Sequence, residues 1–161
     1  MIQTAAAVQD FHRIYRELAA AGEIAEGTLL TIGGLTPALR AALLGDLGPM
    51  RLAMDNCPNQ LVLFGPPEDA RRLRERLSAE GAICQELPFG RAYHTALFKP
   101  LADAFRRYFQ SLDFGSGTTT VYSASTCTPF PADADGIREL AARQWEHPVR
   151  FTETIERLYA D

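Results

Sequence analysis

The chain has 161 residues, of which 47% are hydrophobic and 22% charged, and its formal net charge is −4. These values are typical of one globular domain with a sizeable core, and they argue against nucleic acid as a partner and against a membrane span. The N-terminus lacks the pattern of a signal peptide and the three cysteines are scattered, so we expect a cytoplasmic protein without disulfides.

The first half of the chain predicts helices and strands with clear boundaries. Helical spacing of apolar residues predicts a helix over 5–21. A short buried strand is expected at 28–34, followed by a helix with Thr36 as N-cap and Pro37 as its first residue. Strands at 50–56 and 60–65 flank the turn "CPN" and predict a hairpin. The first of these strands alternates strictly, which places on one face Met50, Leu52 and Met54 and on the other Arg51, Ala53 and Asp55.

An amphipathic helix over 66–81 follows, and a strand over 82–88 closes this half. The helix has a buried stripe of Ala70, Leu73 and Leu77. Its four arginines allow a phosphate site, but neighbouring acids favour a solvated face. The order β-α-β-β-α-β over 28–88 predicts an α+β fold of the ferredoxin-like type: a four-stranded antiparallel sheet with two helices on one face.

The second half predicts three helices and one strand. The helices are expected at 96–112, at 136–145 and from "PVRF" to the end, and the strand at 120–125. A single strand cannot form a sheet, so we expect this region to be incomplete and the chain to be cut. The expected inner faces of the first and last helices are Leu97, Leu101, Phe105, Tyr108 and Leu112, and Phe151, Ile155, Leu158 and Tyr159.

His94 is the strongest chemical candidate, although no nucleophile accompanies it. His12, His94 and His147 are too far apart in sequence to predict a metal site, and no metal-binding spacing is present. Ser116 in "FGSGTT" has the wrong glycine spacing for a nucleophile elbow, and free cysteines in turns or strands are typical packing residues. From composition alone, His94 is either a general base or a cap of the helix that follows.

Four stretches, in order, carry a resemblance to a known family. They are "MRLAMDNCPNQLVLFGPPEDARRLRERLSAEGAICQELP", "FGRAYHTALF", "TVYSASTCTPF" and "AARQWEHPVRFTETIERLYAD". Together they resemble the acyltransferase domain of polyketide and fatty acid synthases, of the malonyl-CoA–acyl carrier protein transacylase type. "DNCPNQ", "RAYHT" and "RQW…PVRF" look most like enediyne-type iterative synthases. The resemblance divides the chain into a helix of the large subdomain (1–27), a ferredoxin-like small subdomain (28–88) and an incomplete remnant of the α/β-hydrolase-like large subdomain (89–161).

The resemblance implies a role for each matching residue. His94 matches the general base, which serves a serine in a G-H-S-x-G elbow upstream of this chain, so the chain alone is expected to be inactive. Arg91, Ala92 and Tyr93 complete the acyl-pocket tetrad, where an aromatic residue before the histidine accompanies malonyl and a serine accompanies methylmalonyl. Arg91 departs from the usual first residue. A carboxylate-binding arginine matches Arg13 or Arg16, with Arg13 preferred.

The implied substrate is malonyl-CoA, and the implied partners are an acyl carrier protein with its phosphopantetheine thiol and the remainder of the synthase. No bound cofactor or metal is expected, and a homodimer through exposed apolar surface is possible on this interpretation. The alternative is a freestanding ferredoxin-like module that uses its open sheet face for a ligand or for dimerisation.

Overall fold

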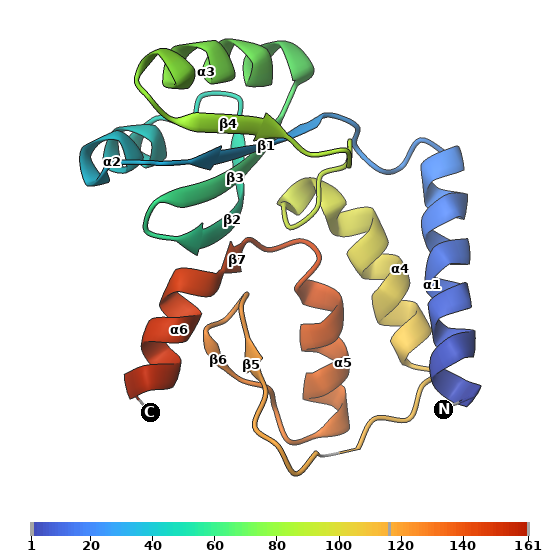
Figure 1. Cartoon of the computed structure of the whole chain (residues 1–161). Coiled ribbons are helices and arrows are strands. Elements are labelled where there is room, and N and C mark those ends of the chain that lie inside the picture. Colours follow the sequence, from blue (N-terminus) through green and yellow to red (C-terminus); the bar gives the residue numbers. More distant parts are fainter. Residues whose placement is uncertain (1, 116, 161) are drawn as a thin grey trace.

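A five-stranded sheet forms the centre of the upper half of the molecule (Figure 1). The computed structural model describes residues 2–115 and 117–160. The strand order is β4-β1-β3-β2-β7, and the strands are β1 Thr28–Gly33, β2 Arg51–Cys57, β3 Gln60–Gly65, β4 Ile83–Glu86 and β7 Val149–Arg150. The first four pair antiparallel, and β2 and β3 form the predicted hairpin. The four-stranded antiparallel sheet predicted for 28–88 is confirmed, and β7, from outside that segment, adds a fifth strand parallel to β2 that the sequence does not predict.

Two helices cover one face of the sheet, as the sequence predicts. They are α2 Pro37–Gly45 and α3 Pro67–Ala79. The side chain of Thr36 accepts a hydrogen bond of 3.2 Å from the backbone N–H of Leu39, which satisfies one free donor at the start of α2. The core of this layer contains Leu30, Ile32, Leu43, Leu61, Leu63, Ala70 and Leu77.

The other face of the sheet is also covered, by α4 Lys99–Phe109 and the short 3-10 helix η1 Ala96–Phe98 that precedes it, and α1 Ile2–Ala20 packs against α4. Leu29, Ala53, Val62 and Phe64 from the strands share one buried cluster with Phe98, Leu101, Phe105 and Phe109. The open sheet face that the freestanding-module alternative requires is therefore absent from the described residues, and that expectation is wrong.

A β-bulge breaks the predicted alternation of β2. Leu52 pairs with Leu63 and Met54 with Val62, so Ala53 is the extra residue. Met50 and Leu52 pack on the α2 and α3 side, whereas Ala53 and Met54 both pack on the α4 side. The prediction that Met54 shares a face with Met50 is wrong, because the bulge turns the strand over after Leu52.

The second half contains more strands than predicted. Two-residue strands β5 Tyr122–Ser123 and β6 Thr128–Pro129 pair antiparallel, although the sequence predicts a loop for the latter. Helix α4 is shorter than the expected 96–112, and Leu97 is 39% exposed rather than inward. Helix α5 spans Ala134–Arg143, and its N-cap is Asp133, whose side chain accepts from Gly136 N–H at 2.7 Å.

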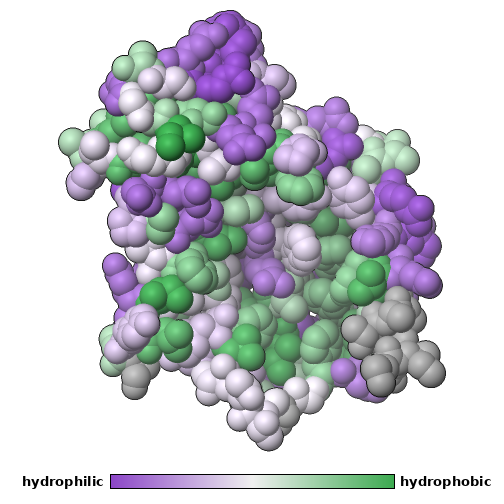
Figure 2. Space-filling view, in the orientation of Figure 1, coloured by the Kyte–Doolittle hydropathy of each residue, from purple (hydrophilic) through white to green (hydrophobic). Residues whose placement is uncertain are grey.

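The last helix, α6 Phe151–Ala160, does not bury the face that the sequence predicts. Thr154 is its buried residue, while Phe151, Leu158 and Tyr159 are 47%, 49% and 88% exposed. Figure 2 shows apolar atoms gathered on the lower half of the molecule, where α5 and α6 lie, and polar atoms over α3 at the top. Within residues 2–115 and 117–160, no helix is long and apolar enough to cross a membrane.

Candidate functional site

The His94 imidazole is held at the junction between β4 and η1 by the end of α5. Its Nδ1 lies 3.0 Å from the backbone oxygen of Gln144, and its backbone N–H donates to the oxygen of Trp145 at 3.1 Å. The rings of His94 and Trp145 are parallel within 5°, with centroids 6.2 Å apart. Because a carbonyl oxygen only accepts, Nδ1 carries the proton of the neutral ring and Nε2 keeps its lone pair. A fixed Nε2 lone pair is what a general base needs.

The His94 side chain does not cap the helix that follows it. Thr95 is the N-cap of η1, and no side chain makes a capping bond there. The backbone of His94 is left-handed, with φ of 59°, a conformation that costs about 1–3 kcal/mol for a residue other than glycine and is found preferentially at functional sites. The helix-cap alternative is therefore wrong.

Burial keeps the His94 ring neutral. Loss of solvation lowers its pKa below the usual value, against the opposing effect of the backbone groups of Gln144 and His147. At neutral pH the ring is therefore a proton acceptor.

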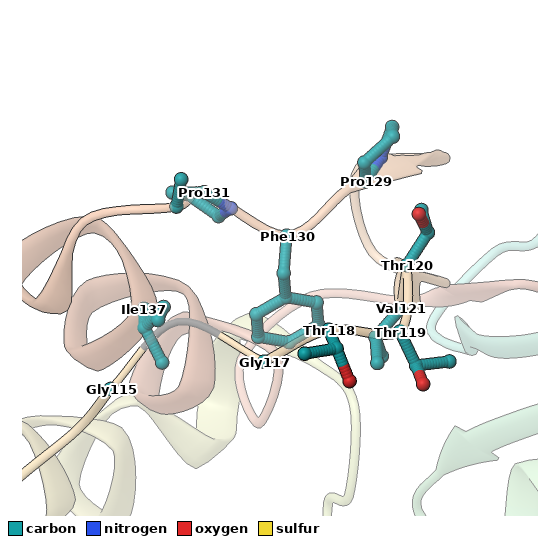
Figure 3. A pocket seen from close by; sticks show the side chains of 11 residues that line it. Gly115, Gly117, Thr118, Thr119, Thr120, Val121, Pro129, Phe130, Pro131 and Ile137 are labelled. Carbon is teal, nitrogen blue, oxygen red and sulfur yellow. The ribbon is translucent and has the colours of Figure 1, made fainter.

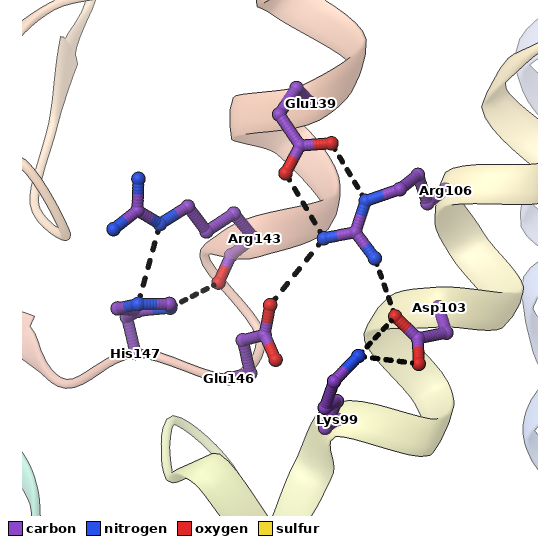
Figure 4. Close-up of polar contacts among 7 residues, drawn as sticks. All are labelled: Lys99, Asp103, Arg106, Glu139, Arg143, Glu146 and His147. Atoms are coloured by element: carbon purple, nitrogen blue, oxygen red, sulfur yellow. Dashed lines mark hydrogen bonds and ion pairs between the residues drawn. The ribbon is translucent and has the colours of Figure 1, made fainter.

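A network of ion pairs between α4 and α5 fixes the segment that supplies the Gln144 carbonyl (Figure 4). The Arg106 guanidinium contacts Glu139 at 2.7 and 3.1 Å, Asp103 at 2.5 Å and Glu146 at 3.4 Å. Lys99 contacts the same Asp103 at 2.7 Å. Because Glu139 and Glu146 lie on either side of Gln144 in the chain, Arg106 anchors both ends of the turn against α4.

The other three residues of the tetrad differ in exposure and in contacts. Ala92 is fully buried, and its oxygen accepts from the Thr95 hydroxyl at 2.8 Å. Tyr93 is half-buried, with its ring 4.8 Å from that of Phe98. Arg91 forms an ion pair with Glu26 and donates to the Tyr15 hydroxyl, so its guanidinium is already engaged.

An apolar cavity of about 380 Å³ lies beside this segment. Its walls are Val8, Phe11, His12, Tyr15, Tyr93, Leu101, Phe105 and Trp145. Since Trp145 also stacks on His94, the cavity and the imidazole share one wall. The sequence predicts Tyr93 here but gives no signal for Trp145 as the partner of His94.

The two candidate arginines of α1 have different surroundings. Arg13 is 53% exposed in its side chain and pairs with Asp10 at 2.9 Å and Glu17 at 3.3 Å. Arg16 donates from Nε to the backbone oxygen of His12 at 3.3 Å. Residues four apart lie on one row of a helix, so Arg16 shares its row with a residue that lines the cavity, whereas Arg13 is held by acids beside it.

The remaining candidates offer little chemistry. A second cavity of about 390 Å³ lies between the loop after α4 and the start of α5, and the Phe130 ring points across it toward Thr118 (Figure 3). Its described walls hold no titratable side chain, and Ser116 lies outside the described residues.

Burial raises the pKa of Cys84, contrary to what an activated thiol needs. Among the described residues, no three potential ligand side chains gather as a metal site.

Comparison with known proteins gives consistent relatives, although no family model matches the chain. The polyketide biosynthesis protein ThaF of Burkholderia thailandensis is 28% identical over 136 residues, which are 83% of this chain and 12% of that protein. The malonyl CoA-acyl carrier protein transacylase of Bacillus subtilis is 29% identical over 114 residues, which are 70% of this chain and 35% of that protein.

Solved structures match over more of the chain. A malonyl-transacylase in complex with a type II polyketide synthase acyl-carrier protein matches with a TM-score of 0.77 and 26% identity, over 98% of this chain and 51% of that one. The acyltransferase domain of an iterative polyketide synthase in enediyne biosynthesis matches with a TM-score of 0.71 and 26% identity, over 91% of this chain and 38% of that one. The chain thus spans about half or less of these proteins, and its relatives and structural neighbours are malonyl-CoA–acyl carrier protein transacylases and polyketide synthase acyltransferase domains, whose α+β fold it shares.

Proposed function

We propose that this chain is the histidine-bearing part of an acyltransferase that moves malonyl from malonyl-CoA to the phosphopantetheine thiol of an acyl carrier protein. The observation that carries the proposal is the state of His94: a half-buried imidazole whose lowered pKa favours the neutral form and whose Nδ1 is fixed on a backbone carbonyl. The similarity to a transacylase in complex with an acyl-carrier protein supports it. The stretches "DNCPNQ", "RAYHT" and "RQW…PVRF", which resemble enediyne-type domains, and the match to one such structure favour an iterative synthase of that kind.

The proposed chemistry uses His94 twice in each half-reaction. Nε2 accepts the serine proton while the serine oxygen attacks the thioester carbonyl of malonyl-CoA. Backbone amides stabilise the oxyanion. The tetrahedral intermediate then collapses, the C–S bond breaks, and the leaving thiolate takes the proton from the His94 imidazolium. The carrier-protein thiol reverses these steps on the malonyl-serine. No bound cofactor takes part.

The serine and the oxyanion loop belong, on this proposal, to sequence outside this chain. We propose that 28–88 is the ferredoxin-like small subdomain and that 1–27 and 89–161 belong to an α/β-hydrolase-like large subdomain. The match covers 51% of a solved transacylase, which supports the assignment of this chain to a part of such an enzyme. The rest of the large subdomain would cover the apolar residues that α6 and the β5 region expose, and the complete enzyme would act in the cytoplasm.

The isolated chain is expected to self-associate through that surface. Val121, Phe151, Leu158 and Tyr159 are each at least 47% exposed, and large apolar side chains exposed near one another favour association. In sedimentation velocity, the sedimentation coefficient should rise with protein concentration, and a Phe151→Ser, Leu158→Ser double variant should reduce the rise. Ile83→Ser is the matched control, because Ile83 is 73% exposed on β4, away from α6. A monomer at every concentration would contradict the prediction.

The malonyl carboxylate should need one arginine of α1. The contacts favour Arg16 over Arg13, since Arg13 is already paired with Asp10 and Glu17. In the complete acyltransferase, Arg16→Gln should lower kcat/KM for malonyl-CoA by about 10- to 150-fold, the value of a hydrogen bond to a charged group. Acetyl-CoA has no carboxylate, so its slow transfer should not change. Arg13→Gln serves as the matched variant, and a larger loss there would assign the role to Arg13.

A further inference from the structure

A series of polar contacts links α1 to the tetrad next to the residues that precede β1. The Nε–H of Arg91 donates to the Tyr15 hydroxyl at 3.2 Å, although the two residues are 76 apart in sequence. The other side of the same guanidinium forms an ion pair with Glu26. The backbones of Glu26 and Arg91 also form an antiparallel bridge, and Gly27 N–H donates to Gly90 O at 3.2 Å. The planar Arg91 fork is therefore held from two directions.

Tyr15 in turn lies against Tyr93. Both residues line the apolar cavity of about 380 Å³ and also a third cavity, of about 520 Å³, on the Arg91 side, so the two tyrosines stand between these spaces. Burial, together with the neighbouring Tyr15 side chain, raises the pKa of Tyr93 to about 12. The Tyr93 ring also contacts buried Phe98, 4.8 Å away between centroids. The Tyr93 ring thus packs on Phe98 and adjoins Tyr15, whose hydroxyl accepts from Arg91.

We propose that Tyr15, held by Arg91 and Glu26, is a positioning residue that fixes the Tyr93 ring beside His94 and so sharpens the exclusion of acyl groups with an α-substituent. This inference rests on the proposed acyltransferase function. A ring excludes an extra methyl group only where it cannot swing aside, and a neighbouring Tyr15 that is itself held in place by Arg91 restricts that motion. The inference also assigns a role to Arg91, the first residue of the tetrad, where this chain departs from the family pattern: Arg91 holds Tyr15.

The first test uses the 161-residue chain and does not depend on activity. In a chain carrying tyrosine labelled with ¹³C at Cζ, the Tyr93 resonance should move in Tyr15→Phe and in Arg91→Gln. Tyr108→Phe is the matched control, because the Tyr108 hydroxyl also bonds a residue of α1, Asp10, at 3.0 Å but does not contact Tyr93. A Tyr93 resonance that is unchanged in Tyr15→Phe would overturn the inference.

The second test measures selectivity in the complete acyltransferase. With malonyl-CoA and methylmalonyl-CoA in competition, Tyr15→Phe should raise the methylmalonyl-to-malonyl ratio by roughly 2- to 12-fold, the effect of one neutral hydrogen bond. General destabilisation lowers both products alike and leaves this ratio unchanged. In a Tyr93→Ser background, adding Tyr15→Phe should change nothing further, because the residue it positions is gone.

The outcomes separate this inference from the proposed function. A wild-type enzyme that loads malonyl, together with a Tyr15→Phe variant of unchanged ratio, overturns the positioning role alone. Equal effects of Tyr15→Phe with and without Tyr93 also overturn it. A complete wild-type protein that loads no acyl group removes the proposed function, and the inference falls with it.

Discussion

If the proposed function holds, replacement of His94 by alanine in the complete acyltransferase is expected to slow formation of the malonyl-serine by about 10²- to 10⁴-fold, the usual contribution of general-base assistance. The reason is structural: Nδ1 is fixed on the Gln144 carbonyl, so Nε2 is the ring nitrogen that can accept the serine proton. Rapid-quench mass spectrometry of the acyl-enzyme measures this rate. Circular dichroism is the control, since a purely structural histidine would lower stability and leave the rate of the folded fraction intact.

The pH profile of the same reaction shows whether His94 acts as a general base or only as a structural residue. Burial lowers the pKa of His94, so the acidic limb of the rate profile should have its inflection below the ordinary histidine value of about 6.5. The His94→Ala variant should lack that limb. The stability contribution has a definite sign: the folded state favours the neutral ring, so stability falls as the pH drops from about 6.5 through the lowered pKa and then levels off. Acylation of His94→Ala at the wild-type rate would contradict the assignment.

Replacement of Tyr93 by serine is expected to raise the use of methylmalonyl relative to malonyl by about 10- to 200-fold, because one methyl group in a pocket is worth about 1–3 kcal/mol. Tyr93 lines the cavity beside the His94–Trp145 pair, and serine leaves space next to the α-carbon. The measurement is the product ratio in competition between the two thioesters.

Tyr93→Phe is the matched control for volume. It keeps the ring and removes only the hydroxyl that interacts with Tyr15, so its shift should be limited to the roughly 2- to 12-fold of one hydrogen bond. A folded Tyr93→Ser variant with an unchanged ratio would show that Tyr93 does not contact the acyl group. Equal shifts in the two variants would show that the hydroxyl, and not the ring volume, sets selectivity.

Elements with strong local signals could be predicted from the sequence. Thr36 and Pro37 mark the start of α2, the "CPN" turn marks the hairpin, and the Ala70–Leu77 stripe marks α3. These signals lie within a few residues of the element that they define. The two-residue strands β6 and β7 have no periodicity, and the bulge at Ala53 depends on pairing with β3. Such features are set by tertiary contacts, so a local pattern could not show them.

Some features of the candidate site could likewise be predicted from a local motif, whereas others depend on tertiary contacts. His94 and Tyr93 could be named from a short motif. The partner that fixes the His94 tautomer is a backbone oxygen 50 residues away. Every residue has such an oxygen, so the sequence does not show which one accepts the bond. Arg106, which anchors that turn, looks in the sequence like one more surface arginine of a helix. Its contacts with Glu139 and Glu146 become visible only when α4 and α5 lie side by side.

Intact-protein mass spectrometry tests the central claim most directly. The complete protein that contains this chain is incubated with malonyl-CoA and then with a phosphopantetheinylated acyl carrier protein, and the 161-residue chain is treated in parallel. The account predicts that the complete protein gains the mass of one malonyl group, loses it to the carrier protein, and does so slowly in the His94→Ala variant, while the 161-residue chain gains none. A complete, folded protein that never acquires an acyl group, or a 161-residue chain that does, would contradict the account.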